Sequence, residues 1–255
     1  MTRWARRWLA GWAWRLRHLS QARWTWLVVG VVVGIHGWVV WSGGVQRVVQ
    51  WYLSCGLRRT EVMAGKVWQL GSYALLHGSW PHVLGNALGL LVLGSRVEQI
   101  LGKAGLCRTL GSGVLGGAVG HLVLAGSGSL ASPLVGISGG CMALLLVITT
   151  LSPESRMWPI PVSARNLGRG ILLAELCFAL LNPELRLPGF SQLGALLARH
   201  GWESWFSVGH ACHVGGGVAG WLVAKAVLRP PVTLEGLRAA RRRREAKTGH
   251  AGPPG

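Results

Sequence analysis

Long apolar runs, separated by short polar connections, constrain the fold of this 255-residue chain more than any other feature. Half of the residues are hydrophobic and only 13% are charged, which is too apolar a composition for a water-soluble domain of this size. A helix of about 20 apolar residues crosses the roughly 30 Å hydrocarbon core of a bilayer. The sequence therefore predicts an all-α polytopic membrane protein.

Six apolar segments are predicted to span the membrane. Tryptophans at both ends of the first and a proline at the start of the second are typical of span boundaries. The fifth is the weakest, because its apolar part covers roughly 13 residues or about 20 Å of helix. The third carries overlapping GxxxG pairs, which favour close helix packing, at Gly113, Gly116, Gly117 and Gly120. The spans lie at about residues 24–41, 80–101, 105–125, 134–151, 169–182 and 207–228.

The distribution of positive charge supports six spans rather than five. With the N-terminus inside, the cytoplasmic segments hold 20 of the 26 Lys and Arg and the external loops hold 6, as the positive-inside rule requires. Five spans would leave the basic C-terminal tail outside. We therefore expect a multi-pass protein with both termini in the cytoplasm, in the plasma (inner) membrane of a bacterium.

Three parts of the chain differ in composition. Residues 1–23 are rich in Trp and Arg, and tryptophans about four residues apart predict an amphipathic helix on the cytoplasmic membrane surface. Residues 24–228 form the membrane domain, and residues 229–255 a basic, disordered cytoplasmic tail. The net charge of +18 is spread over tails and loops rather than one folded face, which favours the lipid bilayer over nucleic acid as the partner.

Residue types that are absent exclude several enzyme classes. The chain has no aspartate, which excludes aspartyl intramembrane proteases and a Ser-His-Asp triad. It also has no HExxH motif, which excludes a zinc intramembrane protease of that type. The five cysteines show no CxxC spacing. No metal or organic cofactor is predicted.

Ser138 lies in an apolar stretch, PLVGISGGCMALLLVITTL, where a serine more often serves helix packing than chemistry. The case for chemistry depends on two other stretches, HVLGN, which contains His82 and Asn86 on one helix face, and HVGGGVAG, which begins with His213. The second, fourth and sixth predicted spans all run inward. These residues are therefore expected roughly 3–10 Å below the starts of their helices, where they can converge.

These stretches resemble the motifs of a known family. HGSWPHVLGNALGLLVLGSRVEQILG, GISGG and CHVGGGVAG match, in order, the HxxxN, GxSG and AHxxGxxxG motifs of rhomboid intramembrane serine proteases. The resemblance covers about residues 60–228. It implies a six-helix bundle that cleaves single-span transmembrane substrates.

The resemblance also implies roles for individual residues. Ser138 would be the nucleophile and His213 the general base of a dyad without an acidic third member. His82 and Asn86 would donate to the oxyanion together with the backbone N–H of Ser138, which the unpaired first turn of a helix leaves available. The supporting positions would be Gly136, Gly139, Met142 and Gly216.

Three other ionisable residues leave alternatives open. His210 lies three residues before His213 and competes for the role of base, so only the motif spacing favours His213. Glu98 is expected to tie helix ends together. Glu175, in the middle of the fifth span, is an unfavourable intramembrane acid and so a functional candidate, but the sequence shows no partner for it.

Departures from the family keep other functions open. Met142 stands where the family usually has an aromatic residue against the catalytic histidine, Gln69 stands for an arginine, and Cys212 for an alanine. We expect an intramembrane serine endopeptidase that cuts near the external side of the membrane. The alternatives are a non-catalytic rhomboid-like protein that binds transmembrane clients, which Met142 favours, a protease specialised for C-terminal sorting tails, and a small transporter or scaffold.

Overall fold

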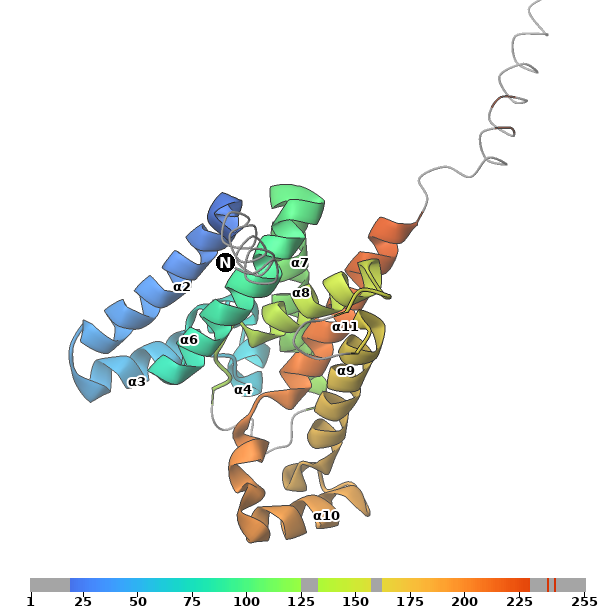
Figure 1. Cartoon of the computed structure of the whole chain (residues 1–255). Coiled ribbons are helices and arrows are strands. Elements are labelled where there is room, and N and C mark those ends of the chain that lie inside the picture. Colours follow the sequence, from blue (N-terminus) through green and yellow to red (C-terminus); the bar gives the residue numbers. More distant parts are fainter. Residues whose placement is uncertain (1–18, 125–132, 157–161, 230–237, 239–240, 242–255) are drawn as a thin grey trace, which may run out of the picture.

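The computed structural model describes residues 19–124, 133–156, 162–229, 238 and 241 (Figure 1). Within these residues the chain is α-helical, and its only β-pairings are two isolated bridges, Leu57–Leu134 and Arg156–Ser163. The predicted all-α class is therefore confirmed. The amphipathic helix predicted over residues 1–23 and the tail over 229–255 lie mostly outside the described residues.

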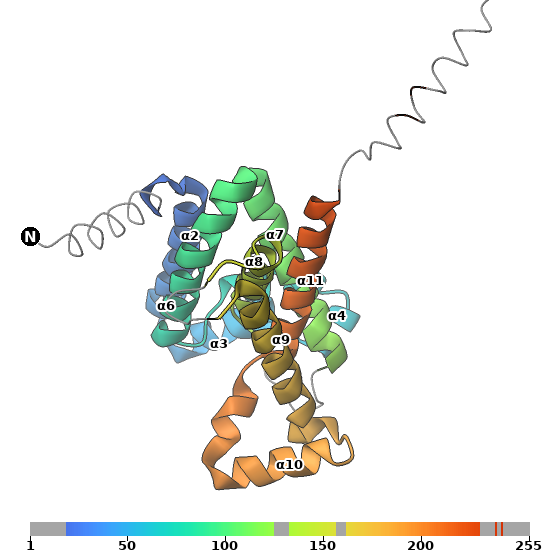
Figure 2. The ribbon, with the colours of Figure 1, turned by 45° about the vertical axis from the view of Figure 1, so that its right-hand side comes forward.

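Six helices carry the fold, and further helical segments fill two long connections. The six are α2 (Arg23–Trp41), α6 (Trp80–Gly89), α7 (Ser95–Leu124), α8 (Ser138–Leu151), α9 (Ala164–Leu181) and α11 (His210–Leu228). The first connection holds α3 (Gly44–Cys55), α4 (Arg59–Met63), α5 (Gln69–Ser72) and η1 (Tyr73–Leu75). The second holds η3 (Pro183–Leu185), α10 (Phe190–Leu197), η4 (Ala198–Trp202) and η5 (Glu203–Ser207). In Figures 1 and 2, α10 lies at the end of the molecule opposite the C-terminal end of α11.

The predicted second and third spans follow one another without a separate loop. A π-helical segment, η2 (Leu90–Gly94), joins α6 to α7. Within α7, Gly102 has a φ of 69° and interrupts the helix, which only glycine adopts at little cost. The predicted boundary between these spans, at residues 101–105, therefore coincides with a kink.

The helices that correspond to the fourth and fifth predicted spans begin at other residues than those spans. The fourth helix begins at Ser138 rather than 134, because Leu134 pairs with Leu57 and Gly136 has a φ of 114° that no helix contains. The fifth begins at Ala164 rather than 169, because the Ser163 hydroxyl caps it by accepting from the Asn166 N–H at 3.4 Å. With 18 residues, α9 is about 27 Å long, so the fifth segment is longer than its apolar part indicates.

By length and composition, two of the described helices can cross a membrane. These are α2 and α11, with 19 residues each. A further apolar helix, α8, has only 14 residues. This criterion therefore identifies fewer spans than the six predicted.

Helices α7, α8 and α11 pack closely against one another through glycines, as the GxxxG pairs predict. A methyl group on Gly113 would lie 2.5 Å from Cβ of Ala143 on α8, and one on Gly120 would lie 2.4 Å from the carbonyl oxygen of Ala211 on α11. Both separations are too short for a real side chain, so the backbones approach as closely as glycine permits. This packing brings the start of α8 beside the start of α11.

Glu98 on α7 ties helix ends together, as predicted. Its carboxylate accepts from the backbone N–H groups of Trp24 and Thr25 at 3.1 and 2.8 Å, and from the Thr25 hydroxyl at 2.7 Å. The residue before α2 is Ala22, which has no side-chain acceptor. Glu98 therefore supplies the N-terminal cap of α2 from another helix.

Candidate active site

Ser138 is the first residue of α8, and its side chain points at α11. The Ser138 hydroxyl lies 2.8 Å from Nε2 of His213, the fourth residue of α11. Seventy-five positions separate the two residues along the chain. The first N–H groups of α8, including that of Ser138, have no partner within the helix and lie at the positive end of its dipole.

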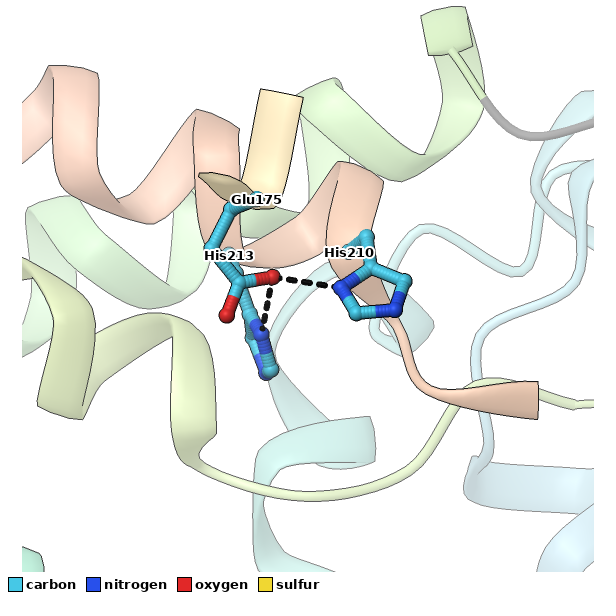
Figure 3. Close-up of side chains that lie close together, drawn as sticks. All are labelled: Glu175, His210 and His213. Carbon is cyan, nitrogen blue, oxygen red and sulfur yellow. Dashed lines mark hydrogen bonds and ion pairs between the residues drawn. The ribbon is translucent and has the colours of Figure 1, made fainter. Parts of the chain in front are cut away.

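A carboxylate lies on the other side of the His213 ring. Nδ1 of His213 is 3.0 Å from Oε2 of Glu175, a residue of α9 (Figure 3). The same oxygen lies 2.6 Å from Nδ1 of His210. Nε2 of His210 lies 2.8 Å from the carbonyl oxygen of Trp205. The structure therefore brings His213, and not His210, to the serine, and it gives Glu175 two partners that the sequence did not reveal.

His82 and Asn86, both on α6, surround the backbone that precedes Ser138. A methyl group on Gly136 would lie 2.7 Å from Nε2 of His82 and 3.5 Å from Nδ2 of Asn86. Asn86 is buried, and its Nδ2 has no hydrogen-bond partner among the described residues. A buried donor without a protein partner is free to meet a water, a ligand or a reacting atom.

The four supporting positions have three different structural settings: a turn, a contact between two helix backbones and an apolar cluster. Gly136 supplies the turn that precedes Ser138. A methyl group on Gly216 would lie 2.2 Å from the carbonyl oxygen of Gly139, so these two glycines bring α11 and α8 into backbone contact. Met142 is buried in an apolar cluster with Leu145 and Leu146, packed against Leu93, Ile171 and Leu172.

A cavity of about 760 Å³ lies beside these residues. Its walls come from α6, the segment that leads into α8, the end of α9, and the connection into α11. They include His82, Val135, Asn182, Val208 and His210. A cavity of this size has room for several residues of an extended peptide. Of the site residues, His82 and His210 line it, whereas Ser138 and His213 do not.

One group of side chains in the described part of the chain has the donor atoms of a metal site. The ligand atoms of Glu175, His210 and His213 lie within 4.8 Å of one another, and two histidines with a glutamate are a known zinc set. The two measured N to O separations, 2.6 and 3.0 Å, are also those of direct hydrogen bonds. The carboxylate can therefore be satisfied by the two rings alone.

The arrangement has the parts that acyl transfer requires. It holds a hydroxyl on an imidazole nitrogen, an acid on the other ring nitrogen, and an unpaired donor near the hydroxyl. A comparison with protein families decides what kind of chain carries it. The family model of the rhomboid domain matches residues 64–230, more than half of the chain. The chain belongs to the rhomboid family.

Family membership makes this an integral membrane protein. Rhomboid proteins are typically serine proteases that act on transmembrane substrates within the bilayer, and inactive members also exist. No curated protein matches the chain.

The contact between Glu175 and the two histidines is the part of this rhomboid site that sequence reasoning missed. Residues 175 and 210 lie on different helices, and no local pattern links them. One signal was present, because His210 and His213 are three positions apart and so share a helix face. When an apolar helix carries a single acid and another helix carries two histidines on one face, a contact between the acid and the histidines can be expected.

Proposed function

We propose that this rhomboid is an intramembrane serine endopeptidase, in which Ser138 is the nucleophile and His213 the general base. The observation that carries the proposal is the 2.8 Å contact between the Ser138 hydroxyl and Nε2 of His213. A hydroxyl held on an imidazole nitrogen is the arrangement that activates serine in hydrolases on unrelated folds.

The reaction follows from the positions of these groups. As the Ser138 oxygen attacks the scissile carbonyl, Nε2 of His213 takes the hydroxyl proton. The negative charge that develops on the carbonyl oxygen receives hydrogen bonds from Nδ2 of Asn86, the His82 ring and the Ser138 N–H. The C–N bond then breaks, His213 returns the proton to the leaving amine, and an acyl-enzyme remains. Water, deprotonated by His213, releases the second product.

The cavity supports a peptide substrate. Its walls join the end of α9 to the start of α11 and include His82, and Ser138, although not part of the lining, is itself partly exposed. A transmembrane helix must expose an extended segment to place a carbonyl on Ser138, and unpaired backbone groups are not tolerated against lipid. We therefore propose that single-span substrates unwind into this cavity and are cut near the external side of the membrane.

We propose that the membrane domain spans residues 24–228 and crosses six times. The crossings are α2, the path from α6 through η2 to Gly102, the rest of α7, α8, α9 and α11. Both termini are cytoplasmic, in the inner membrane of a bacterium, because this orientation places most Lys and Arg inside. Ser138, His82 and His213 then share the external half of the bilayer.

Active-site labelling and proteolysis test the function together. Purified protein is treated with a fluorophosphonate probe, and a transmembrane substrate is offered in liposomes. We expect the native chain to label and cleave, and Ser138→Ala and His213→Ala to do neither. Ser95→Ala, a buried helical serine on α7, and His200→Ala, an exposed histidine, are the matched controls and should behave as the native chain does.

Three outcomes contradict the proposal. Labelling that survives Ser138→Ala means that another residue is the nucleophile. Labelling that is lost equally in Ser95→Ala means that the loss is not specific. A folded native protein that neither labels nor cleaves, but co-purifies with transmembrane clients, makes the client-binding function the better one.

A further inference from the structure

Glu175 occupies an unusual position for an acid. It lies in the middle of α9, which the proposed topology places within the membrane, and only 19% of its side chain is exposed. A carboxylate there is unfavourable unless partners stabilise it. Oε2 faces two imidazole nitrogens, one on each of two residues of α11 (Figure 3).

We propose that Glu175 and His210 form a positioning pair, which holds the His213 ring in the orientation and tautomer that accept the Ser138 proton. The inference rests on the proposed protease function and extends it, because a dyad of Ser138 and His213 alone leaves both residues unused. Glu175 acts through His213 and touches neither substrate nor Ser138.

The tautomer of His213 follows from its two neighbours. An ionised carboxylate only accepts hydrogen bonds, so Nδ1 of His213 must carry the proton that bridges the 3.0 Å to Glu175. In a neutral ring, Nε2 then carries the lone pair. That lone pair faces the Ser138 hydroxyl at 2.8 Å, which is the arrangement a general base needs.

The protons of His210 are placed in the same way. Its Nε2 faces the carbonyl of Trp205, which only accepts, so Nε2 carries a proton. A second proton is shared between Nδ1 and the Glu175 carboxyl group, 2.6 Å apart. The ring is also fixed in place, because it stacks on Phe178 with centroids 5.1 Å apart and an angle of 20°.

With one proton shared between them, Glu175 and His210 carry no net charge as a pair, which makes their position away from bulk water less unfavourable. When His213 takes the Ser138 proton, its new positive charge forms against a carboxylate that is already in place. Acids that support a catalytic histidine act in this way, without themselves taking up the proton. His210 holds the carboxylate, and the carboxylate holds His213.

A metal ion at the same three residues would have the opposite effect. It would coordinate Nδ1 of His213, which would then carry its proton on Nε2 and donate toward Ser138. Such a ring cannot act as a base. Zinc is therefore expected to inhibit this enzyme, and a chelator is expected to leave it fully active.

Three variants of the full chain in detergent test the pair. We measure the second-order rate of fluorophosphonate labelling, and kcat and KM on a transmembrane substrate, for Glu175→Gln, His210→Ala and the double variant. Glu154→Gln is the matched control, since Glu154 pairs with Arg165 beyond the far end of α8. Melting temperatures are recorded for each.

We expect Glu175→Gln to lower the labelling rate and kcat about 10- to 100-fold and to leave KM nearly unchanged. This loss is smaller than the roughly 10⁴-fold fall in kcat seen when a fully buried acid of a catalytic triad is replaced, because Glu175 is partly exposed. His210→Ala should lower kcat about 10-fold. The double variant should be no worse than Glu175→Gln, because both residues act through one path. Glu154→Gln should match the native chain.

Several results overturn the inference and leave the proposed function intact. Native kcat in Glu175→Gln, with Ser138→Ala inactive, removes the positioning role alone. Fully additive losses in the double variant mean that the residues act separately, and loss of activity on chelation means that a metal is required. If Glu175→Gln melts far below the native chain, His210→Ala decides alone, and native kcat in that variant rejects the pair. Activity that survives Ser138→Ala rejects the protease function itself.

Discussion

The unpaired amide of Asn86 gives the sharpest expectation for this site. In most buried residues, removal of a polar side chain breaks a hydrogen bond and lowers stability. Nδ2 of Asn86 has no partner among the described residues, so Asn86→Ala breaks none at that atom in the resting protein. An unpaired buried donor is unfavourable by about 1–3 kcal/mol, and its removal offsets the packing lost with the side chain.

Catalysis should respond very differently from stability. If Nδ2 donates to the oxyanion, Asn86→Ala removes a hydrogen bond that exists only in the transition state. The loss of one such donor lowers kcat by about 10²–10³, or roughly 2.7–4 kcal/mol. KM should change little, because the substrate in its ground state does not use this donor.

The assay combines cleavage of a transmembrane substrate with thermal unfolding in the same detergent. We expect Asn86→Ala to lose at least about 100-fold in kcat while its melting temperature stays within a few degrees of the native value or rises. Asn166→Ala, an exposed asparagine on α9, serves as the control and should change neither. A kcat within about threefold of native would refute the oxyanion role of Asn86, and a large fall in melting temperature would refute the claim that its amide is unpaired.

Three further expectations follow from local geometry. Gly136→Ala should abolish labelling, since the new methyl group would lie 2.7 Å from the His82 ring and the backbone, at φ 114°, disfavours a side chain by about 1–3 kcal/mol. Gly216→Val should lower the melting temperature, because even its Cβ would lie 2.2 Å from the Gly139 carbonyl oxygen, and overpacking of this kind typically destabilises by about 1–3 kcal/mol or more. Stability should also fall as the pH is lowered from 6.5 toward 4. Burial lowers the pKa of His77, which lies in the loop before α6, from 6.5 to about 4. In this pH range the unfolded chain therefore binds a proton at His77 that the folded chain does not bind. That loss amounts to at most about 3 kcal/mol, and His77→Phe should lose less stability than the native chain between pH 7.5 and 4.5.

Each of these has a result that contradicts it. Normal labelling of Gly136→Ala would mean that His82 does not lie against this turn. An unchanged melting temperature in Gly216→Val would mean that α8 and α11 are further apart than described. Equal acid sensitivity of His77→Phe and the native chain would assign the pH dependence to other groups.

The sequence predicts much of the fold because the helices are bounded by local chemistry. Tryptophans and Pro81 mark the ends of apolar runs, and the glycines of α7 mark a face that packs closely. The start of α8 could not be predicted in this way. It depends on a pairing between Leu134 and Leu57 and on the backbone of Gly136, and neither leaves a signal in an apolar stretch.

The candidate site also contains residues that local sequence patterns predict and one residue that they do not. Ser138, His213, His82 and Asn86 are recognisable because they stand in motifs with fixed spacing. Glu175 belongs to no such motif, and its role depends on how α9 packs against α11. Such a contact depends on the register of two helices, which the sequence of either helix does not specify.

The glycine contacts among α7, α8 and α11 restrict how this protein can change during evolution. At Gly113, Gly120 and Gly216, the smallest possible substitution would meet a side chain or carbonyl of the neighbouring helix. Substitutions at these three glycines are therefore not expected to be neutral, because the glycines set how closely the helices that carry Ser138 and His213 approach. Under the proposed function, changes in substrate preference are expected at the rim of the cavity, in the connection from α9 to α11, where most side chains are at least partly exposed. The packing of these three helices thus separates a part of the molecule that must stay fixed from a rim that can vary.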